Sequence, residues 1–406
     1  MMNWRKIHPI DPFSRDFLRL TLEIDKHVEG YIDAYYGPAD LKDEVAVTPR
    51  KTPGALLDDV QQLQEKIPTA DPQRHAYLTA TVRALDCTIR MLDGETFDYL
   101  DEIERIYDIQ PQPVAERRFT AAHQTLDNLL PGSGSLNQRL ANKRKKYELT
   151  PDKALPLLEL ARQETRRRTA KFIELPDDES VEVKLAKDEP WGAYNWYLGN
   201  GRSLNEFNTD VPISALNLLG TFAHEGYPGH HTESMLKEIT LYLEKGHGEQ
   251  AAMLLHSPAA VIAEGIATTA LEIIFPDSSH HDWNHNVLFN AAGLNDTDTV
   301  TYLRQITEAG SELKYVTGNA AILFHTGQLD KAQTIDYITT YGLSTPERAA
   351  KSFSFLSHPL YRSYIFTYTQ GYDLIQQASS VDKTDLFSRL LTEQFLPSDL
   401  AAMVNN

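Results

Sequence analysis

Residues 211–231 read VPISALNLLGTFAHEGYPGHH. The first part of this stretch is almost entirely apolar, and it predicts a buried helix that leads directly into His224 and Glu225. Pro212 lies near the expected start of the helix, where a missing N–H group costs nothing. A histidine followed by a glutamate on a buried helix is typical of zinc hydrolases, in which the imidazole binds the metal and the carboxylate acts as the base.

The next histidines are not at the usual spacing of four residues from His224. In a continuous helix His231 would lie about 10 Å from His224 along the axis, whereas zinc lies about 2 Å from each ligand nitrogen. The Pro228-Gly229 pair must therefore break the helix or bulge out of it. A two-residue bulge would make His230 the second ligand, with His231 as a hydrogen-bond donor or a partner of the transition state. The reverse assignment of these two histidines remains open.

A third ligand is expected from a separate helix that begins at Ser257-Pro258, a serine cap followed by a proline at the first helical position. This helix carries Glu264 among small apolar residues. A buried carboxylate is costly unless it is paired or binds metal, so Glu264 is the expected metal ligand. Pairing with an arginine or a histidine in the core is the alternative. Two histidines and a glutamate leave one position of a Zn²⁺ ion open for water, as in catalytic sites.

A rival cluster consists of His280, His281 and His285, of which the last two have helical i,i+4 spacing. These residues follow a polar, turn-like stretch, so a solvated loop and helix start is the favoured interpretation. The single cysteine, Cys87, is expected to be a small buried residue on a helix. One cysteine also excludes an intrachain disulfide.

The composition of the chain limits the kinds of partner that it can bind. The 406 residues carry a net charge of -18, which disfavours nucleic acid and anionic membranes as partners. The basic clusters at 143–146 and 166–168 are interpreted as solvated faces of helices. Neither a stretch of signal-peptide type nor a run long enough to span a membrane is present, so a cytoplasmic location is expected.

Helical periodicity extends over most of the chain, and we predict an all-α fold, mainly helical with few short strands. Residues 174–201 interrupt the periodicity with prolines, glycines and aromatic residues. This interruption suggests a boundary between an N-terminal helical lobe, 1–175, and a lobe that bears the metal site, 176–406, unless the two form one continuous domain. Helices are expected at Phe17–Ile32, Leu56–Ile67, Ala76–Leu92, Phe97–Tyr107, Ala115–Leu130, Leu136–Leu149 and Ala154–Ile173.

The stretch from His224 to His231 resembles the hallmark of a bacterial family known as domain of unknown function 885. That family is similar to the gluzincins, so the resemblance implies a mainly helical, zincin-like zinc peptidase. Further stretches resemble motifs of the same family and are distributed over most of the chain. They are Tyr31–Pro38, Asn205–Asp210, Glu264-Gly265, Phe324–Gly327 and Tyr368–Gly371.

The family motifs imply roles for Tyr368 and His325 in stabilising the oxyanion of the transition state, and His231 is a candidate because it adjoins a ligand. The chain departs from the family at Ile266, where tryptophan is usual, and after His231, where Thr232-Glu233 replaces Leu-Gln. These departures leave the expected ligands intact, but they alter the expected shape of the pocket.

Together these residues predict a zinc-dependent hydrolase, with a peptide or a small amide as substrate and Glu225 as the general base. One alternative is an inactive protein of the same fold that binds metal and peptides without cleaving them. Another is a helical interaction scaffold whose histidines merely fill the core. An intact Glu225 favours the enzyme, since a purely structural metal site needs no base beside its ligand.

Overall fold

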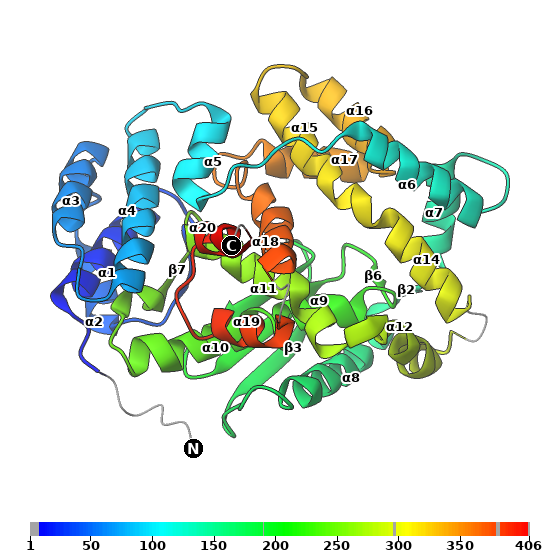
Figure 1. Ribbon diagram of the computed structural model, residues 1–406, viewed down its shortest axis with the longest axis horizontal. Helices are drawn as coiled ribbons and strands as arrows, with labels where there is room; N and C mark the ends of the chain where they lie inside the picture. The colour runs from blue at the N-terminus through cyan, green and yellow to red at the C-terminus, as the bar shows by residue number, and fades with distance from the viewer. Residues whose placement is uncertain (1–7, 190, 295–297, 379–381, 405–406) are drawn as a thin grey trace.

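Helices form most of the protein in the computed structural model, which describes residues 8–189, 191–294, 298–378 and 382–404. A few short strands accompany them, and this confirms the mainly helical fold class (Figure 1). The helices of the first part of the chain are α1 (Pro12–Asp25), α2 (Ala39–Val47), α3 (Pro53–Glu65), α4 (Pro72–Leu92), α5 (Tyr99–Tyr107), α6 (Glu116–Leu129), α7 (Leu136–Lys145) and α8 (Pro151–Thr169).

The second part of the chain carries the remaining helices. They are α9 (Leu218–Glu225), α10 (His230–Lys237), α11 (Pro258–Ile274), α12 (His280–Trp283), α13 (Asn290–Ala292), α14 (Val300–Gly310), α15 (Val316–His325), α16 (Lys331–Tyr341), α17 (Pro346–Leu356), α18 (Ile365–Ala378), α19 (Lys383–Leu390) and α20 (Pro397–Val404). Short 3-10 or π-helical turns cover Glu238–Leu243, Gly248–Ala251, Pro276–Ser278, Asn284–Phe289 and Ser311–Tyr315.

Local sequence explains where many helices begin. Proline occupies the first helical position at Pro12, Pro53, Pro72, Pro151, Pro258 and Pro346. The residue before it is an aspartate, a threonine or a serine in each case, which is the usual N-cap chemistry. In α1, for example, the Asp11 carboxylate accepts the backbone N–H of Ser14 at 2.7 Å.

The strands form three small sheets. β1 (Ile32–Tyr35) pairs antiparallel with β7 (Ala252–Leu254), and β2 (Glu148–Leu149) pairs antiparallel with β6 (Ile213–Ser214). The third sheet has the order β3-β5-β4, with β3 (Ser180–Ala186) parallel to β5 (Arg202–Asn208) and β4 (Ala193–Tyr197) antiparallel to it. The interrupted stretch 174–201 therefore contains two of these strands, β3 and β4, joined by irregular chain.

Several helices are shorter than the sequence predicts, and two of them illustrate the reason. The first ends at Asp25, whose carboxylate accepts the N–H of Ile32 at 3.0 Å as the chain turns into β1. The helix before His224 begins only at Leu218, because the chain around Pro212 pairs with β2 as a strand. In both places a strand pairing with a distant segment replaces the expected helical turns.

The centre of the protein is α11, which packs against α4, α5, α8, α9, α10, α18 and α19. Figure 1 shows α18, coloured orange, beside α11, which lies about 100 residues earlier in the chain. Their backbones meet at two glycines: a Cβ atom at Gly371 would lie 2.3 Å from the carbonyl oxygen of Val261, and one at Gly265 would lie 2.7 Å from that of Gly371. Only glycine at these two positions permits so close a crossing.

The buried clusters combine residues from both sides of position 175. One cluster joins Phe17 and Leu78 to Leu243 and Leu254, and another joins Ile103 to Val261. The division into two lobes at that position stays a prediction.

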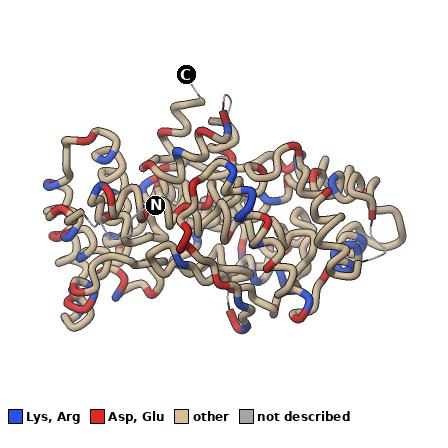
Figure 2. The backbone as a smooth tube through the Cα atoms, turned by 90° about the horizontal axis from the view of Figure 1, so that it is seen from below, with Lys and Arg blue, Asp and Glu red and all other residues tan. Residues whose placement is uncertain are grey.

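Charges of both signs are interspersed along the chain (Figure 2). Lys143 binds Asp298 at 2.9 Å, and Arg168 binds Glu164 at 2.6 Å, so acidic neighbours compensate part of both basic clusters. No single helix of the described residues is long and apolar enough to cross a membrane. The pair Pro258–Ile274 and Pro276–Ala292, bent by 56°, meets the criteria of length and composition when taken together.

Candidate metal centre

The helix breaks between the two histidine positions, as the Pro-Gly pair indicates. α9 ends at Glu225 and α10 begins at His230. The chain turns back sharply at Gly229, whose N–H donates to the carbonyl of Ala223 at 3.0 Å. A Cβ atom at Gly229 would lie 1.9 Å from the carbonyl oxygen of His224, so only glycine fits here. The turn brings the first residue of α10 beside the last turn of α9.

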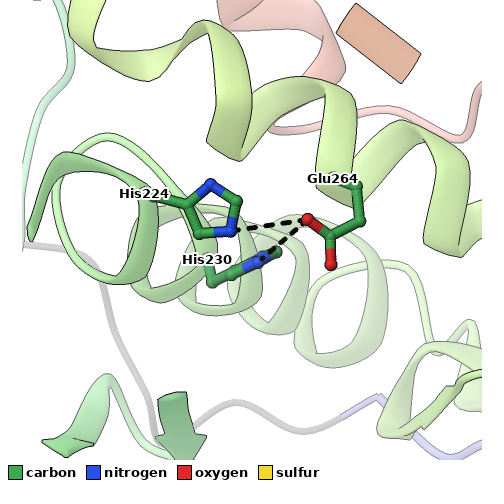
Figure 3. Close-up of side chains that lie close together, drawn as sticks. All are labelled: His224, His230 and Glu264. Atoms are coloured by element: carbon green, nitrogen blue, oxygen red, sulfur yellow. Dashed lines mark ion pairs between the residues drawn. The ribbon is translucent and has the colours of Figure 1, made fainter. Parts of the chain in front are cut away.

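Three side chains from three helices converge at this turn (Figure 3). The Nε2 atoms of His224 and His230 lie 3.4 and 3.8 Å from Oε2 of Glu264. The two imidazole rings meet edge to face with their centroids 4.8 Å apart. Within the described ranges this is the one group of three residues whose ligand atoms all lie within 4.8 Å of one another, as a shared metal ion requires.

The carboxylate of Glu264 fits the role of a ligand. Its Oε1 accepts a hydrogen bond from the Tyr364 hydroxyl at 2.7 Å, whereas its buried Oε2, which faces both histidines, has no hydrogen-bond partner. A buried oxygen without a partner costs free energy, and a cation between the three side chains would remove that cost. Ligand atoms about 2 Å from a tetrahedral zinc ion lie about 3.4 Å from one another, which is close to the separations of this cluster.

Burial and neighbouring charges shape the ionisation of the cluster. Burial lowers the pKa of His224, but the nearby carboxylates of Glu264 and Glu225 outweigh this effect and raise it to about 9. Burial raises the pKa of Glu225, and the charges of the two histidines oppose the rise. Burial also acts to raise the pKa of Glu264, but His224 and His230 lower it overall. The carboxylates thus create a negative potential in which a cation is stabilised.

The cluster opens into a cavity of about 260 Å³. Glu225 lines the cavity next to the histidines, and so does Tyr368, whose ring stacks near His224 with the centroids 6.4 Å apart. The aromatic stretch that precedes α9 in the sequence also contributes to the wall. The residues of that stretch that line the cavity are Trp191, Ala193, Tyr194, Asn195 and Tyr197.

His231 does not reach the cavity. Its ring is fully buried, with Nδ1 2.8 Å from the Ser203 hydroxyl and Nε2 3.1 Å from the Glu179 carboxylate. The same carboxylate accepts the Tyr227 hydroxyl and, at 2.6 Å, the Nε–H of Arg166. Both ring nitrogens are engaged in this network outside the cavity, which fits the hydrogen-bonding alternative, while the transition-state role stays a prediction without support from this position. His231 ties the turn between α9 and α10 to β5 and α8.

His325 is also absent from the lining of the cavity. Its Nε2 lies 2.7 Å from the carbonyl oxygen of Leu356, and its ring stacks on Tyr99 with centroids 4.2 Å apart. These contacts join α15 to α17 and α5. The structure therefore places His325 outside the lining of the cavity, and its expected role at an oxyanion stays a prediction without support from this position.

The rival histidines lie on and after the short helix α12. The rings of His280 and His281 are 4.0 Å apart, but these residues belong to no group of three potential ligands in the described parts of the chain. Cys87 is buried on α4, as expected, and burial raises the pKa of its thiol to about 12.

Sequence reasoning missed three residues that shape the site. Tyr364 holds Glu264, Glu179 holds His231, and Asp33 lines the cavity from β1. Asp33 belongs to the Tyr31–Pro38 stretch singled out in the sequence, which was the available signal. Glu179 lies in the segment that interrupts the helical pattern, where nothing local marks a buried carboxylate.

No protein-family model matches the chain, and no curated protein matches its sequence. The structure is similar to that of a lipoprotein candidate from Colwellia psychrerythraea, with a TM-score of 0.52 and 13% identity, over 86% of this chain. The chain spans 66% of that protein, so the likeness shows a shared fold over this part alone. A second structure, the M32 carboxypeptidase from Deinococcus radiodurans, aligns with 97% of this chain and with 89% of the carboxypeptidase chain, at 10% sequence identity. The TM-score of this alignment, 0.35, is too low to establish a common fold.

Proposed function

We propose that this protein is a zinc-dependent hydrolase of peptide or related amide bonds. The observation that carries the proposal is the convergence of His224, His230 and Glu264 beside Glu225 in one cavity. Two imidazoles and one carboxylate are the ligand set of many catalytic zinc sites, which keep a further position for water. The resemblance to the gluzincin-like family points to the same chemistry, and a cytoplasmic location is part of the proposal.

The residues of the site have separate roles in the proposed reaction. His224, His230 and Glu264 would hold the zinc ion, which supplies a Lewis acid that polarises a carbonyl group and lowers the pKa of a water molecule. Glu225 takes the proton of the attacking water and passes it to the leaving amine. The Tyr368 hydroxyl, in the same cavity, donates a hydrogen bond to the oxyanion that develops on the substrate.

Metal content is the direct test. The purified protein, reconstituted with zinc, is expected to hold about one zinc ion per chain by elemental analysis, because a site of three such ligands binds tightly. His224→Ala and Glu264→Ala should each lose that ion. His281→Ala, which removes a histidine from the rival cluster, should retain it. A wild-type chain that holds no zinc after reconstitution would reject the proposal.

Hydrolysis is measured with a peptide library, with products read by mass spectrometry. Cleavage that stops on chelation and returns with zinc is the expected result. A chain that binds zinc and peptides, yet cleaves none of them, would instead be a binding protein of this fold.

Tyr364 should matter for metal affinity rather than for the fold. Tyr364→Phe removes the hydrogen bond that orients the Glu264 carboxylate and is expected to weaken zinc binding about 10- to 100-fold, measured against a competing chelator. The matched control is Tyr372→Phe, which removes a 2.8 Å hydrogen bond to Glu272 between the same two parts of the chain. Equal zinc affinity in both variants would show that Tyr364 does not position the ligand.

A further inference from the structure

Five carboxylates line the cavity, and four of them have an evident partner or role. Glu264 faces the two histidines and Glu225 is the proposed base. Glu233 binds Lys237 at 2.7 Å, and Glu249 binds Arg74 at 2.7 Å. The fifth is Asp33, which has no cationic partner among the described residues.

Asp33 is held in place by the fold rather than by charge. It lies on β1, whose pairing with β7 fixes the strand at the wall of the cavity. The hydroxyl of Tyr194, on β4, donates to its Oδ1. Burial raises the pKa of Asp33 to about 7, and the charges of Glu264 and Glu225 add to the rise. The carboxyl group therefore lies in the field of two other carboxylates, and no lysine or arginine of the described residues forms an ion pair with it.

The remainder of the wall is unsuited to a carboxylate ligand. Of the lysine and arginine residues in the described chain, Lys237 alone lines the cavity, and Glu233 already neutralises it. Tyr194, whose hydroxyl donates to Asp33, stacks on Trp191 with the ring centroids 5.6 Å apart, and all three residues line the cavity. Aromatic faces next to a carboxylate attract an ammonium group, because both present negative electrostatic potential.

We propose that Asp33, with the aromatic side chains of Trp191 and Tyr194, forms a subsite for a protonated amine of the substrate. The amine is either the free amino end of a peptide or a lysine side chain, and both would place one positive charge against the carboxylate. This inference rests on the proposed function of the cavity. It predicts that the enzyme selects its substrate by an amine and does not recognise a free carboxyl end.

The test measures peptide binding by calorimetry. It uses the zinc-loaded full chain with the substitution Glu225→Gln, so that the peptide probes are not hydrolysed during the measurement. One pair of probes is tetra-alanine with a free or an acetylated amino end. The other is an acetylated, amidated tripeptide with lysine or norleucine at its centre. In at least one pair the peptide with the charged amine should bind about tenfold more tightly than its uncharged counterpart, because a hydrogen bond to a charged group usually contributes about that factor in affinity.

Adding Asp33→Asn should abolish that preference, while Asp43→Asn, which removes an exposed carboxylate on α2, should preserve it. A preference in the first pair assigns the subsite to the amino end, and one in the second pair assigns it to a lysine side chain. Equal binding within both pairs, no binding of any probe, or a preference that survives Asp33→Asn would overturn the proposal.

The two proposals fail separately. Zinc-dependent cleavage by the wild type without any charge preference would leave the hydrolase and remove the amine subsite. A charge preference that depends on Asp33, in a chain whose wild type cleaves no peptide, would leave the subsite and remove the hydrolase.

Discussion

Glu225→Gln is expected to lower peptide turnover about 100- to 10,000-fold, the usual contribution of a general base. Glutamine has nearly the same shape as glutamate, but it cannot accept the proton of the attacking water. Glu225 is only 7% exposed and lines the cavity beside the histidines. A base dissolved in the solvent therefore has little access to the place of the missing carboxylate. Because Glu225 is not one of the three converging ligands, the zinc content of the variant should equal that of the wild type.

The control is Glu244→Gln, the same change at an exposed glutamate beyond α10, which should leave turnover unchanged. Turnover is read by mass spectrometry on a peptide that the wild type cleaves, and zinc is measured in the same preparations. Activity near the wild-type value in Glu225→Gln would remove this residue from the mechanism. Loss of zinc together with activity would show that Glu225 supports the metal rather than the proton transfer.

Local signals in the sequence predict those features that depend on a few neighbouring residues. Ser257 and Pro258 mark the start of α11, and the helix begins there. Pro228 and Gly229 indicate a break, and the structure turns at this point because Gly229 lies against the backbone of α9. The placement of His230 beside His224 follows from that turn.

Other features depend on contacts that no local pattern carries. β1 is a strand because it pairs with β7, some 220 residues later in the chain. That pairing, and not the sequence around Asp33, brings its carboxyl group to the cavity. The position of the His231 ring could not be predicted for a similar reason, since its partner Glu179 lies 52 residues earlier in an irregular stretch. Adjacency to a ligand in sequence does not determine which way a side chain points once the helix has turned.

Arg166 shows the limit of interpreting charge clusters from sequence. Its cluster was expected to be a solvated helix face, and Arg167 fits that description, with 57% of its side chain exposed. Arg166, its neighbour, instead binds the fully buried Glu179 carboxylate. Helical spacing turns adjacent residues about 100° apart, so members of one basic run face different surroundings.

Gly371→Ala is expected to destabilise the fold by about 3 kcal/mol, at the upper end of the usual cost of overpacking. The new methyl group would lie 2.3 Å from the carbonyl oxygen of Val261 and 2.7 Å from the backbone nitrogen of Gly265. Both atoms belong to the backbone of α11, so no rotation of a side chain can relieve the clash. The two helices must move apart, and Glu264, next to Gly265, must move with α11 relative to Tyr364.

Urea unfolding of the zinc-free protein measures this cost without the added stability that bound metal supplies. Gly310→Ala serves as the control, because this helical glycine has no atom within 4 Å of the position of an added Cβ. Alanine is about 1 kcal/mol more favourable than glycine inside a helix, so the control should be neutral or more stable. Zinc affinity should fall in Gly371→Ala alone, since the crossing sets the position of the Glu264 ligand. Unchanged stability and affinity in Gly371→Ala would mean that α18 does not fix α11 at this crossing, and that the metal centre is assembled without it.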